Sequence, residues 1–188
     1  MFCAIFHDLH PRLAFERRDS AESRLDKIRG LIESAKFSIH DLSRCKATRE
    51  GELSRLNMPF ELGLDFGCKM YFGNGRDRKR ILILEEEQYR YQAAISDLAG
   101  WDIMHHGNSY ALAMKCTHRW LISEAQLPPS PPSKLSAAYA TFQGWDYERQ
   151  LAQGWSEEDI QDYQTPDVLQ AMLAWRERGR PARYRAGT

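Results

Sequence analysis

The sequence predicts an α/β protein whose parallel sheet is flanked by helices and is followed by a small helical C-terminal region. Strand-like patterns alternate with helical periodicity over most of the chain, as in parallel sheets covered on both faces. The continuous apolar run Ile81–Leu84 is typical of a strand buried on both sides. The proline-rich spacer Pro128–Pro132 separates the α/β domain, residues 1–127, from the helical residues 133–188.

The composition favours a soluble, cytoplasmic protein. At 188 residues the chain is long enough for one α/β core and a small appendage. Its 26 basic and 26 acidic residues balance, which disfavours nucleic acid or an acidic membrane as a partner. The four cysteines are far apart and form neither a metal-binding pair nor a disulfide framework. The sequence contains no apolar segment long enough to span a bilayer and no signal-peptide pattern at its start.

Three elements are predicted before the centre of the α/β domain. Apolar spacing predicts a helix over Met1–Leu9, and the pattern after it predicts a strand over Arg12–Glu16. A second helix is expected to begin after Ser23, with an apolar stripe that continues to Ser34.

The chain is organised around a strand, a loop and a helix. The alternation in Phe37–Asp41 predicts a strand, so Asp41 lies at its carboxyl end. The polar residues 44–56 are expected to form a loop long enough to act as a lid. Asn57 is expected to cap the next helix, with Pro59 in its first turn. Four residues are expected on the apolar face of this helix: Phe60, Leu64, Cys68 and Tyr71.

Further elements complete the α/β domain. After the strand Ile81–Leu84, residues 89–98 are expected to form a helix or a partly helical loop. Trp101–Met104 is predicted as the last strand, and Ser109–Ser123 as the last helix. Four residues of that helix are expected to face the core: Leu112, Cys116, Trp120 and Leu121.

Helical patterns continue after the spacer. Helices are expected over Leu135–Phe142 and Tyr147–Leu151, after the capping pair Ser156 and Asp159, and from Thr165 to Trp175. Trp145, Trp155 and Trp175 require burial, either against the α/β domain or against another chain. The arginine-rich residues 176–185 are interpreted as a solvated tail rather than as a nucleic-acid arm.

Asp41 and Glu61 are the first candidates for a functional site. Open α/β sheets bind ligands at the carboxyl ends of their strands, so both carboxylates are expected to face one crevice. Glu61 is expected in the first turn of its helix, where the helix dipole keeps a carboxylate ionised. Asp65 shares a helix face with Glu61, whereas Gly63 and Gly67 leave a second face open to a ligand or a strand.

Purely structural roles would also account for these residues. Glu61 taken alone fits a stabiliser of a helix N-terminus, and Asp41 fits a turn aspartate. Ser43 is more often a cap than a ligand-binding hydroxyl, although its position beside Asp41 makes it a candidate. His40 points away from Asp41 in a regular strand, so we interpret it as a packed histidine.

Other motifs give weaker signals. His105 and His106 are adjacent and alternate in direction, which is poor geometry for joint metal binding, and no metal site is predicted. Tyr89 and Tyr91 are interpreted as core residues rather than as a wall for a nucleobase. The sequence contains no G-x-x-x-x-G-K phosphate loop, which disfavours an NTPase.

Two segments resemble a known superfamily. The strand end at residues 39–43 and the helix start at residues 57–63 are similar to those of nucleoside 2-deoxyribosyltransferase-like and Toll/interleukin-1 receptor (TIR)-like proteins. Residues 23–28 and 89–100 also resemble a group of uncharacterised bacterial proteins. The resemblance covers the chain from its start to about residue 123.

The resemblance implies a flavodoxin-like fold and cleavage of N-glycosidic bonds in nucleosides, nucleotides or NAD. Several members are bacterial antiphage effectors. Their catalytic glutamate matches Glu61, and the aspartate that positions ribose matches Asp41. These proteins usually begin with a strand, and we expect this chain to start after it. The resemblance then implies a gap between the predicted strands Arg12–Glu16 and Phe37–Asp41, unless another segment or a partner fills it.

The sequence therefore predicts hydrolysis or transfer at an N-glycosidic bond of NAD or a (deoxy)nucleoside or nucleotide. Glu61 is the predicted catalytic residue, and four residues are predicted to bind the substrate: Asp41, Ser43, Asn57 and Asp65. No cofactor is predicted, because NAD would be a substrate, and a second copy or an effector complex is the predicted protein partner. The alternative is a non-catalytic nucleotide-sensing or assembly module that docks a partner through its C-terminal helices.

Overall fold

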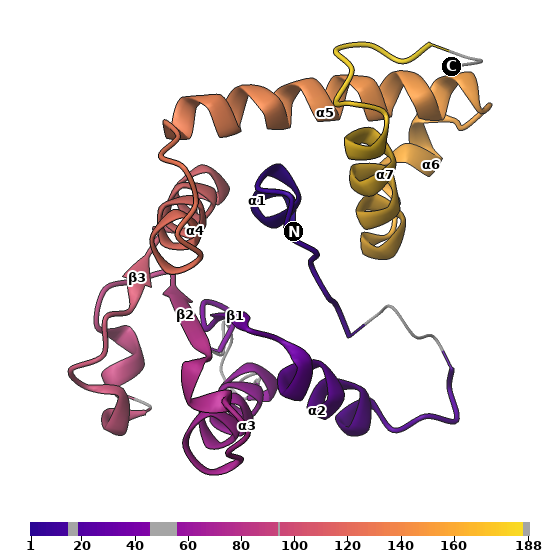
Figure 1. Cartoon of the computed structure of the whole chain (residues 1–188). Coiled ribbons are helices and arrows are strands. Elements are labelled where there is room, and N and C mark those ends of the chain that lie inside the picture. Colours follow the sequence, from indigo (N-terminus) through magenta and orange to yellow (C-terminus); the bar gives the residue numbers. More distant parts are fainter. Residues whose placement is uncertain (15–18, 46–55, 94, 186–188) are drawn as a thin grey trace. The chain divides into compact units, whose positions relative to one another are not determined.

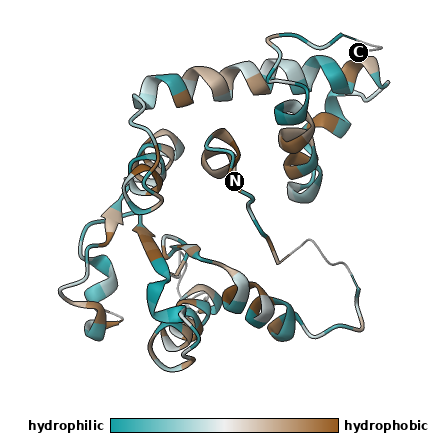
Figure 2. Cartoon of the chain, in the orientation of Figure 1, coloured by the Kyte–Doolittle hydropathy of each residue, from teal (hydrophilic) through white to brown (hydrophobic). Residues whose placement is uncertain are grey.

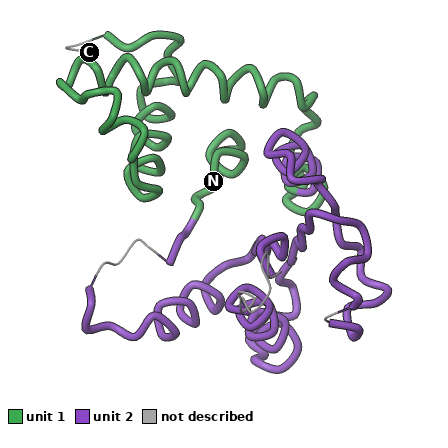
Figure 3. Tube along the Cα trace, turned by 180° about the vertical axis from the view of Figure 1, so that it is seen from behind, with its two compact units in different colours: residues 1–11, 121–188 green, residues 12–120 purple. Residues whose placement is uncertain are grey.

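The chain forms two compact units. The computed structural model describes residues 1–14, 19–45, 56–93 and 95–185. Unit 1 comprises residues 1–11 and 121–188, and unit 2 comprises residues 12–120 (Figure 3). This division differs from the one drawn at the proline-rich spacer, because the first eleven residues belong with the C-terminal helices.

Unit 2 contains a parallel three-stranded sheet in the order β1-β2-β3 (Figure 1). In its register, Ile39 of β1 lies opposite Leu82 of β2, and Leu84 of β2 lies opposite Met104 of β3. The sheet confirms the predicted α/β class with helices around parallel strands. The strand bounds are Phe37–Asp41 for β1, Arg80–Glu85 for β2 and Met104–His105 for β3.

The middle strand is the hydrophobic centre of unit 2. Leu82, Ile83 and Leu84 are all buried, as the continuous apolar run predicted, and β2 is coloured as hydrophobic over much of its length in Figure 2. The prediction for the last strand was only partly right, because the strand begins at Met104 and Trp101 lies in a bend before it. The Trp101 amide donates to the Leu98 carbonyl, which takes it out of any strand ladder.

The described part of the predicted strand Arg12–Glu16, residues 12–14, is not part of this sheet. Residues 12–14 have no strand structure, and Phe15 and Glu16 lie outside the described residues. Ala14 instead packs beside Ile28 and Ile32, so burial against a helix replaces pairing with a strand. Among the described residues, β1 is therefore an edge strand of the sheet.

Helices of unit 2 cover both faces of the sheet. Successive strand residues point to opposite faces, so His40 and Phe37 mark different sides of β1. His40 contacts Asp65 of α3, and the Phe37 ring lies 6.0 Å from that of Trp120 in α4. The helix bounds are Arg24–Ser34 for α2, Asn57–Tyr71 for α3 and Tyr110–Glu124 for α4, with 3₁₀ turns at Arg76–Arg78, Arg90–Ala93 and Ser96–Leu98.

The buried face of α3 differs from the predicted one. Leu62, Asp65 and Cys68 face inward, whereas Phe60 and Tyr71 are 57% and 87% exposed. The prediction is confirmed for Cys68 and was wrong for Phe60 and Tyr71, because the inward face includes a charged residue, Asp65, which an apolar pattern cannot identify. A Cβ added at Gly63 or Gly67 would meet no atom of another described segment within 4 Å. Within the described chain, no strand therefore packs closely against either glycine.

Two smaller predictions for these helices are also corrected. The N-cap position of α3 is Leu56, and Asn57 is the first helical residue. In α4, Leu112 is 46% exposed, and the buried residues include Thr117, His118 and Leu121.

A buried ionic cluster joins the helices to the sheet. The carboxylate of Asp65 lies 2.9 Å from His40 Nε2 and 3.1 Å from Lys79 Nζ. Lys79 Nζ also donates to the carbonyls of Ile32 and Ala35, both at 2.6 Å, at the C-terminal end of α2. All three ionisable side chains are buried, and the interpretation of His40 as a packed histidine is confirmed.

The cluster keeps Asp65 ionised. Burial acts to raise the pKa of the Asp65 carboxyl, but the hydrogen bond from His40 and the charge of Lys79 outweigh it, and the net pKa lies below its ordinary value of 3.8. A buried carboxylate without such partners would cost several kcal/mol, so the three side chains depend on one another.

Unit 1 is helical. The two predicted helices over 135–151 are one continuous helix, α5, because Phe142 and Trp145 are buried on either side of Gly144 and continue the buried face across it. The predicted capping pair is confirmed: Asp159 N donates to Ser156 Oγ, and Ser156 N donates to Asp159 Oδ2. The helix bounds are Phe2–Phe6 for α1, Pro132–Ala152 for α5, Glu157–Gln161 for α6 and Thr165–Glu177 for α7.

An aromatic core holds unit 1 together. The Phe2 ring of α1 lies 4.9 Å from Tyr139, 5.8 Å from Phe142 and 5.8 Å from Trp175. These distances suit offset or edge contacts between rings. Trp145 and Trp175 are almost fully buried, but within unit 1 rather than against the α/β domain or another chain, as we had expected. Trp155 remains 38% exposed and packs edge-on against Tyr163.

No helix in the described part of the chain combines the length and the hydrophobicity needed to cross a lipid bilayer.

Replacing Lys79 by Met should destabilise unit 2 by about 3–5 kcal/mol, because it leaves a buried carboxylate with one partner fewer. Urea unfolding measures the loss. The Lys36→Met variant, at an exposed lysine of the same unit, should change the free energy of unfolding by less than about 0.5 kcal/mol. Equal effects of the two substitutions would contradict the role given to the cluster.

The stability difference between the parent protein and Lys79→Met should depend on pH. Because the folded-state pKa of Asp65 is lowered, its stabilisation is fully present above the unfolded pKa of 3.8 and is lost as the pH falls through the folded value. The difference in stability between the parent protein and Lys79→Met should therefore shrink below about pH 3.8.

Replacing Phe2 by Ala should cost unit 1 about 3–5 kcal/mol, because the ring fills the centre of the aromatic core. Phe60→Ala, at the exposed face of α3, is the control. Tryptophan fluorescence during urea unfolding reports the change, and a Phe2→Ala protein as stable as Phe60→Ala would show that α1 is not part of the core.

Candidate functional site

The carboxyl ends of the three strands bring polar side chains together at one edge of the sheet. β1 ends at Asp41, β2 ends at Glu85, and β3 is followed by His106. Because the strands are parallel, these ends lie at the same edge, where open α/β sheets bind their ligands.

Asp41, Ser43 and His106 form a hydrogen-bonded cluster at this edge. Ser43 donates to Asp41 Oδ1 twice, from its amide at 3.0 Å and from its hydroxyl at 2.5 Å. His106 Nε2 lies 2.8 Å from Ser43 Oγ and 3.5 Å from Asp41 Oδ1. The structure therefore joins Asp41 and Ser43, which the sequence predicted, to a histidine that the sequence did not assign.

These contacts hold Asp41 as a carboxylate. Burial acts to raise the pKa of Asp41, but the hydroxyl and amide hydrogen bonds from Ser43 and the proximity of His106 lower it below its ordinary value. An ionised carboxylate only accepts hydrogen bonds, so the single hydroxyl proton of Ser43 points to Asp41.

The proton count excludes a serine nucleophile activated by His106 in this arrangement. The Ser43 hydroxyl uses its only proton in the hydrogen bond to Asp41. His106 Nε2 must therefore be the donor in its hydrogen bond with Ser43 Oγ. A general base would have to accept that proton, and a triad aspartate would bond the other ring nitrogen. His106 Nδ1 is instead buried without a hydrogen-bond partner among the described residues.

A second ion pair supports the turn that carries Asp41 and Ser43. Arg90 bonds the buried carboxylate of Glu85 and also donates to the backbone carbonyl of Ser43 at 3.0 Å. Glu85 Oε1 further accepts from the Glu86 amide at 2.7 Å. The pair thus connects the end of β2 to the residues after β1, and sequence reasoning had treated these residues only as the end of a strand and part of a loop.

Glu61 is positioned by α2 rather than by the dipole of its own helix. It is the fifth residue of α3, so the prediction that it lies in the first turn was wrong. Its side chain is 17% exposed, and its carboxylate lies 3.6 Å from the guanidinium of Arg24, whose side chain is 60% exposed. We had expected the positive end of the α3 dipole to be the electrostatic partner of Glu61, and the structure gives it the Arg24 guanidinium instead.

The remaining predicted site residues have different surroundings. Asn57 is exposed at the start of α3, and Asp65 is fully buried in the ionic cluster with His40 and Lys79. The described contacts join neither of them to Asp41. The predicted lid, residues 44–56, falls largely on residues 46–55, which lie outside the described residues.

Cys45, two residues after Ser43, is a further side chain close to this edge in the sequence. Burial, with a further contribution from Glu85, raises the pKa of the Cys45 thiol, which keeps the sulfur in its less nucleophilic form. Within the described ranges, His, Cys, Asp and Glu side chains form no group of three suited to hold a metal ion.

Tyr91 is buried in the core as predicted, whereas Tyr89 is exposed.

The signal that finds His106 is positional. A polar residue directly after a strand of a parallel sheet lies at the same edge as one after any other strand, as Asp41 does. We had considered His106 only with its neighbour His105, as a metal ligand.

Comparison with known proteins gave no matching family model, no matching curated protein and no matching solved structure. The function proposed below therefore rests on the geometry of the site and on the sequence resemblance.

Replacing Ser43 by Ala should raise the pKa of Asp41, because the hydroxyl that stabilises the carboxylate is lost. An NMR titration of the Asp41 carboxyl carbon measures the shift. Ser109→Ala removes a hydroxyl that bonds the Leu112 amide instead and should leave the titration unchanged. An unchanged pKa of Asp41 in Ser43→Ala would contradict the cluster.

Proposed function

We propose that unit 2 hydrolyses or transfers an N-glycosidic bond of NAD or of a (deoxy)nucleoside or nucleotide. The observation that supports this best is the ionised Asp41 carboxylate, fixed by Ser43 at the edge of a parallel sheet where α/β proteins bind ligands. A rigid carboxylate at such an edge suits the hydroxyl groups of a sugar, which donate hydrogen bonds to it.

Asp41 would bind the ribosyl group through its second oxygen. All three of its described contacts, from the Ser43 amide, the Ser43 hydroxyl and His106, use Oδ1. Oδ2 is left for a ligand, and the two hydrogen bonds from Ser43 fix the direction in which it points. Because Oδ1 is held by Ser43 and His106 and Oδ2 is left for a ligand, we favour a binding role for Asp41 over a catalytic one.

Glu61 would act at the anomeric carbon. A carboxylate attacks this centre or stabilises the oxocarbenium charge that develops there as the base leaves. Its neighbour Arg24 balances the charge of the Glu61 carboxylate across 3.6 Å, and the Arg24 side chain is 60% exposed. In this reaction NAD would be a substrate and not a cofactor.

The resemblance of residues 39–43 and 57–63 to deoxyribosyltransferase-like and TIR-like proteins supports the same assignment. It also suggests the setting that we propose, a bacterial antiphage effector in the cytoplasm that works in an assembly with further copies or with a partner.

A non-catalytic module is the second candidate. Glu61 is mostly covered and paired with Arg24, and no described contact connects it to Asp41. In that case the Asp41 cluster would bind a nucleotide without cleaving it, and the C-terminal helices would dock a partner.

Replacing Glu61 by Gln should lower the turnover of NAD or nucleosides by at least about 100-fold, because the charge that meets a cationic transition state is removed while the size is kept. Mass spectrometry of released nicotinamide or free base measures turnover. Asp41→Asn should mainly raise KM, with a smaller loss of turnover.

The matched control is Glu33→Gln. Glu33 also pairs with an arginine of α2, Arg29, at 3.8 Å, so its replacement tests the loss of a surface ion pair alone. A Glu61→Gln protein that releases base as fast as Glu33→Gln would reject the catalytic role and favour the binding module.

A further inference from the structure

Tyr89 lies in the turn that follows β2 and has a strained backbone. Its φ is +65°, in the left-handed region that bulky residues rarely adopt. Asn and Asp tolerate this region, and left-handed residues commonly follow the end of a helix. One of these two reasons covers each of the other described non-glycine residues with a positive φ: Asp8, Asn74, Asn108, Gln126 and Arg180. Neither reason covers Tyr89, because it precedes a 3₁₀ turn.

The turn that carries Tyr89 is held by contacts on both sides. The Arg90 guanidinium bonds the carboxylate of Glu85 and thereby closes the turn after β2. It also donates to the carbonyl of Ser43 at 3.0 Å. The amide of Gln92 donates to the Tyr89 carbonyl at 3.1 Å. A left-handed residue of this size persists only where its surroundings hold it, and such residues gather at functional sites.

The same contacts bring Tyr89 close to Asp41. The Cα atoms of Tyr89 and Arg90 are about 3.8 Å apart because the two residues are adjacent. Arg90 reaches from there to the carbonyl of Ser43, whose amide and hydroxyl both bond Asp41. One arginine side chain therefore separates Tyr89 from the turn that carries the Asp41 carboxylate. The base of a nucleoside extends from its sugar over a comparable length.

The ring of Tyr89 is available to a ligand. Tyr89 is 61% exposed, and its side chain makes no hydrogen bond, ring contact or cation–π contact with the described residues. Its neighbour Tyr91 is instead 6% exposed and packs in the core of unit 2. The strain at Tyr89 is thus not offset by packing of its own side chain within the described chain.

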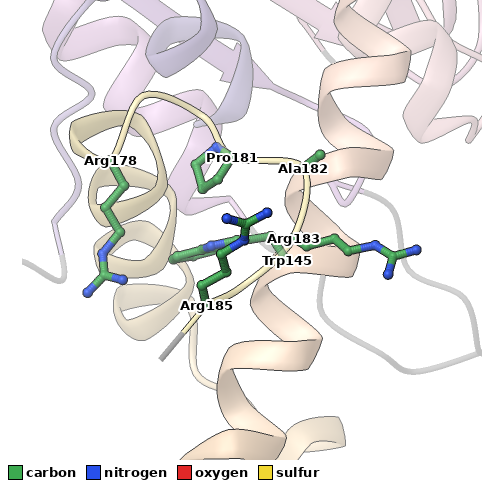
Figure 4. Close-up of a pocket in the computed structure, with 6 residues that line it drawn as sticks. All are labelled: Trp145, Arg178, Pro181, Ala182, Arg183 and Arg185. Atoms are coloured by element: carbon green, nitrogen blue, oxygen red, sulfur yellow. The ribbon is translucent and has the colours of Figure 1, made fainter. Parts of the chain in front are cut away.

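Unit 1 contains a hollow that offers a poorer site. The arginine-rich segment after α7, predicted as a solvated tail, is held by hydrogen bonds from the Trp175 indole and the Tyr184 amide. It leaves a hollow of about 470 Å³ beside α5 (Figure 4). Trp145 in its lining is 1% exposed, so its ring gives no face to a ligand. Figure 4 shows the guanidinium groups of Arg178 and Arg183 pointing apart, and we place no ligand there.

We propose that Tyr89 forms the wall on which the base of the substrate stacks, while Asp41 Oδ2 binds the sugar. This inference rests on the proposed function, in which the ligand is a nucleoside, a nucleotide or NAD. Every base has a π-face, so stacking on a tyrosine supplies affinity for a flat ring without selecting one base. A wall whose backbone is already held also lowers the entropy cost of binding.

Replacing Tyr89 by Gly separates binding from folding. Glycine adopts a left-handed φ without strain, so Tyr89→Gly should be at least as stable to urea as the parent. The same variant lacks the ring and should bind adenosine about tenfold more weakly, because base stacking is lost. Isothermal titration calorimetry measures the affinity, with Glu61→Gln as the background so that adenosine is not consumed. A variant that binds less tightly at undiminished stability does not owe its loss to misfolding.

Three further variants test the ring itself. Tyr89→Phe keeps the ring and should bind adenosine about as tightly as the parent, whereas Tyr89→Leu keeps apolar bulk without a π-face and should bind as weakly as Tyr89→Gly. Tyr71→Ala removes a tyrosine of α3 that is 87% exposed and should leave the affinity unchanged. Equal affinity in the parent and in Tyr89→Gly overturns the proposal, and so does a parent that binds neither adenosine nor NAD.

Turnover distinguishes a failure of this inference from a failure of the proposed function. In an active parent, Tyr89→Gly should raise KM about tenfold with little change in kcat. If the parent releases base and Tyr89→Gly has the same KM, the proposed function stands and the role of Tyr89 is rejected. If adenosine binds through Tyr89 but no base is released from adenosine or NAD, the role of Tyr89 stands and catalysis by Glu61 is rejected.

Discussion

The α/β unit depends on the buried carboxylate of Asp65. This single group sits where β1, α3 and the end of α2 meet, and it is held by His40 of β1 and by Lys79, the residue before β2. Lys79 in turn bonds the last carbonyls of α2, so one side chain neutralises a charge and terminates a helix. Burial of a charge is costly unless every partner is in place, which makes the cluster a strong constraint on how these elements pack.

The candidate site lies at the end of the elements that this cluster fixes. His40 and Asp41 are adjacent on β1, so the bond that holds His40 inward directs Asp41 to the opposite side of the strand. At the edge of the sheet a second pair, Glu85 and Arg90, holds the turn that follows β1. The His40–Asp65 and Arg90–Glu85 contacts thus set the direction of the exposed Asp41 carboxylate. Such preorganisation is what a sugar-binding group requires, because the cost of ordering it is met during folding.

Unit 1 is stabilised mainly by hydrophobic packing of aromatic rings rather than by buried ion pairs. Its centre consists of aromatic rings, and one of them, Phe2, comes from the opposite end of the sequence to its neighbours Phe142 and Trp175. Non-directional burial of this kind tolerates contributions from distant parts of a chain, whereas the ionic cluster of unit 2 requires defined partners. The polar contacts of unit 1 lie around this core and hold residues 180–184 against it.

The sequence by itself determined the elements whose signal is local. Strand β1 and the buried middle of β2 follow from side-chain periodicity, and the capping pair Ser156 and Asp159 follows from backbone chemistry within one turn. The positions of Asp41 and Ser43 at a strand end are of the same kind. Only the tertiary structure decided that His106 and Arg90 join them, that Glu61 pairs with Arg24, that Asp65 is buried, and that α1 packs with the C-terminal helices. Each of these contacts links residues on different elements, and periodicity carries no information about which elements meet, because the free energy that selects their packing comes from contacts between residues distant in sequence.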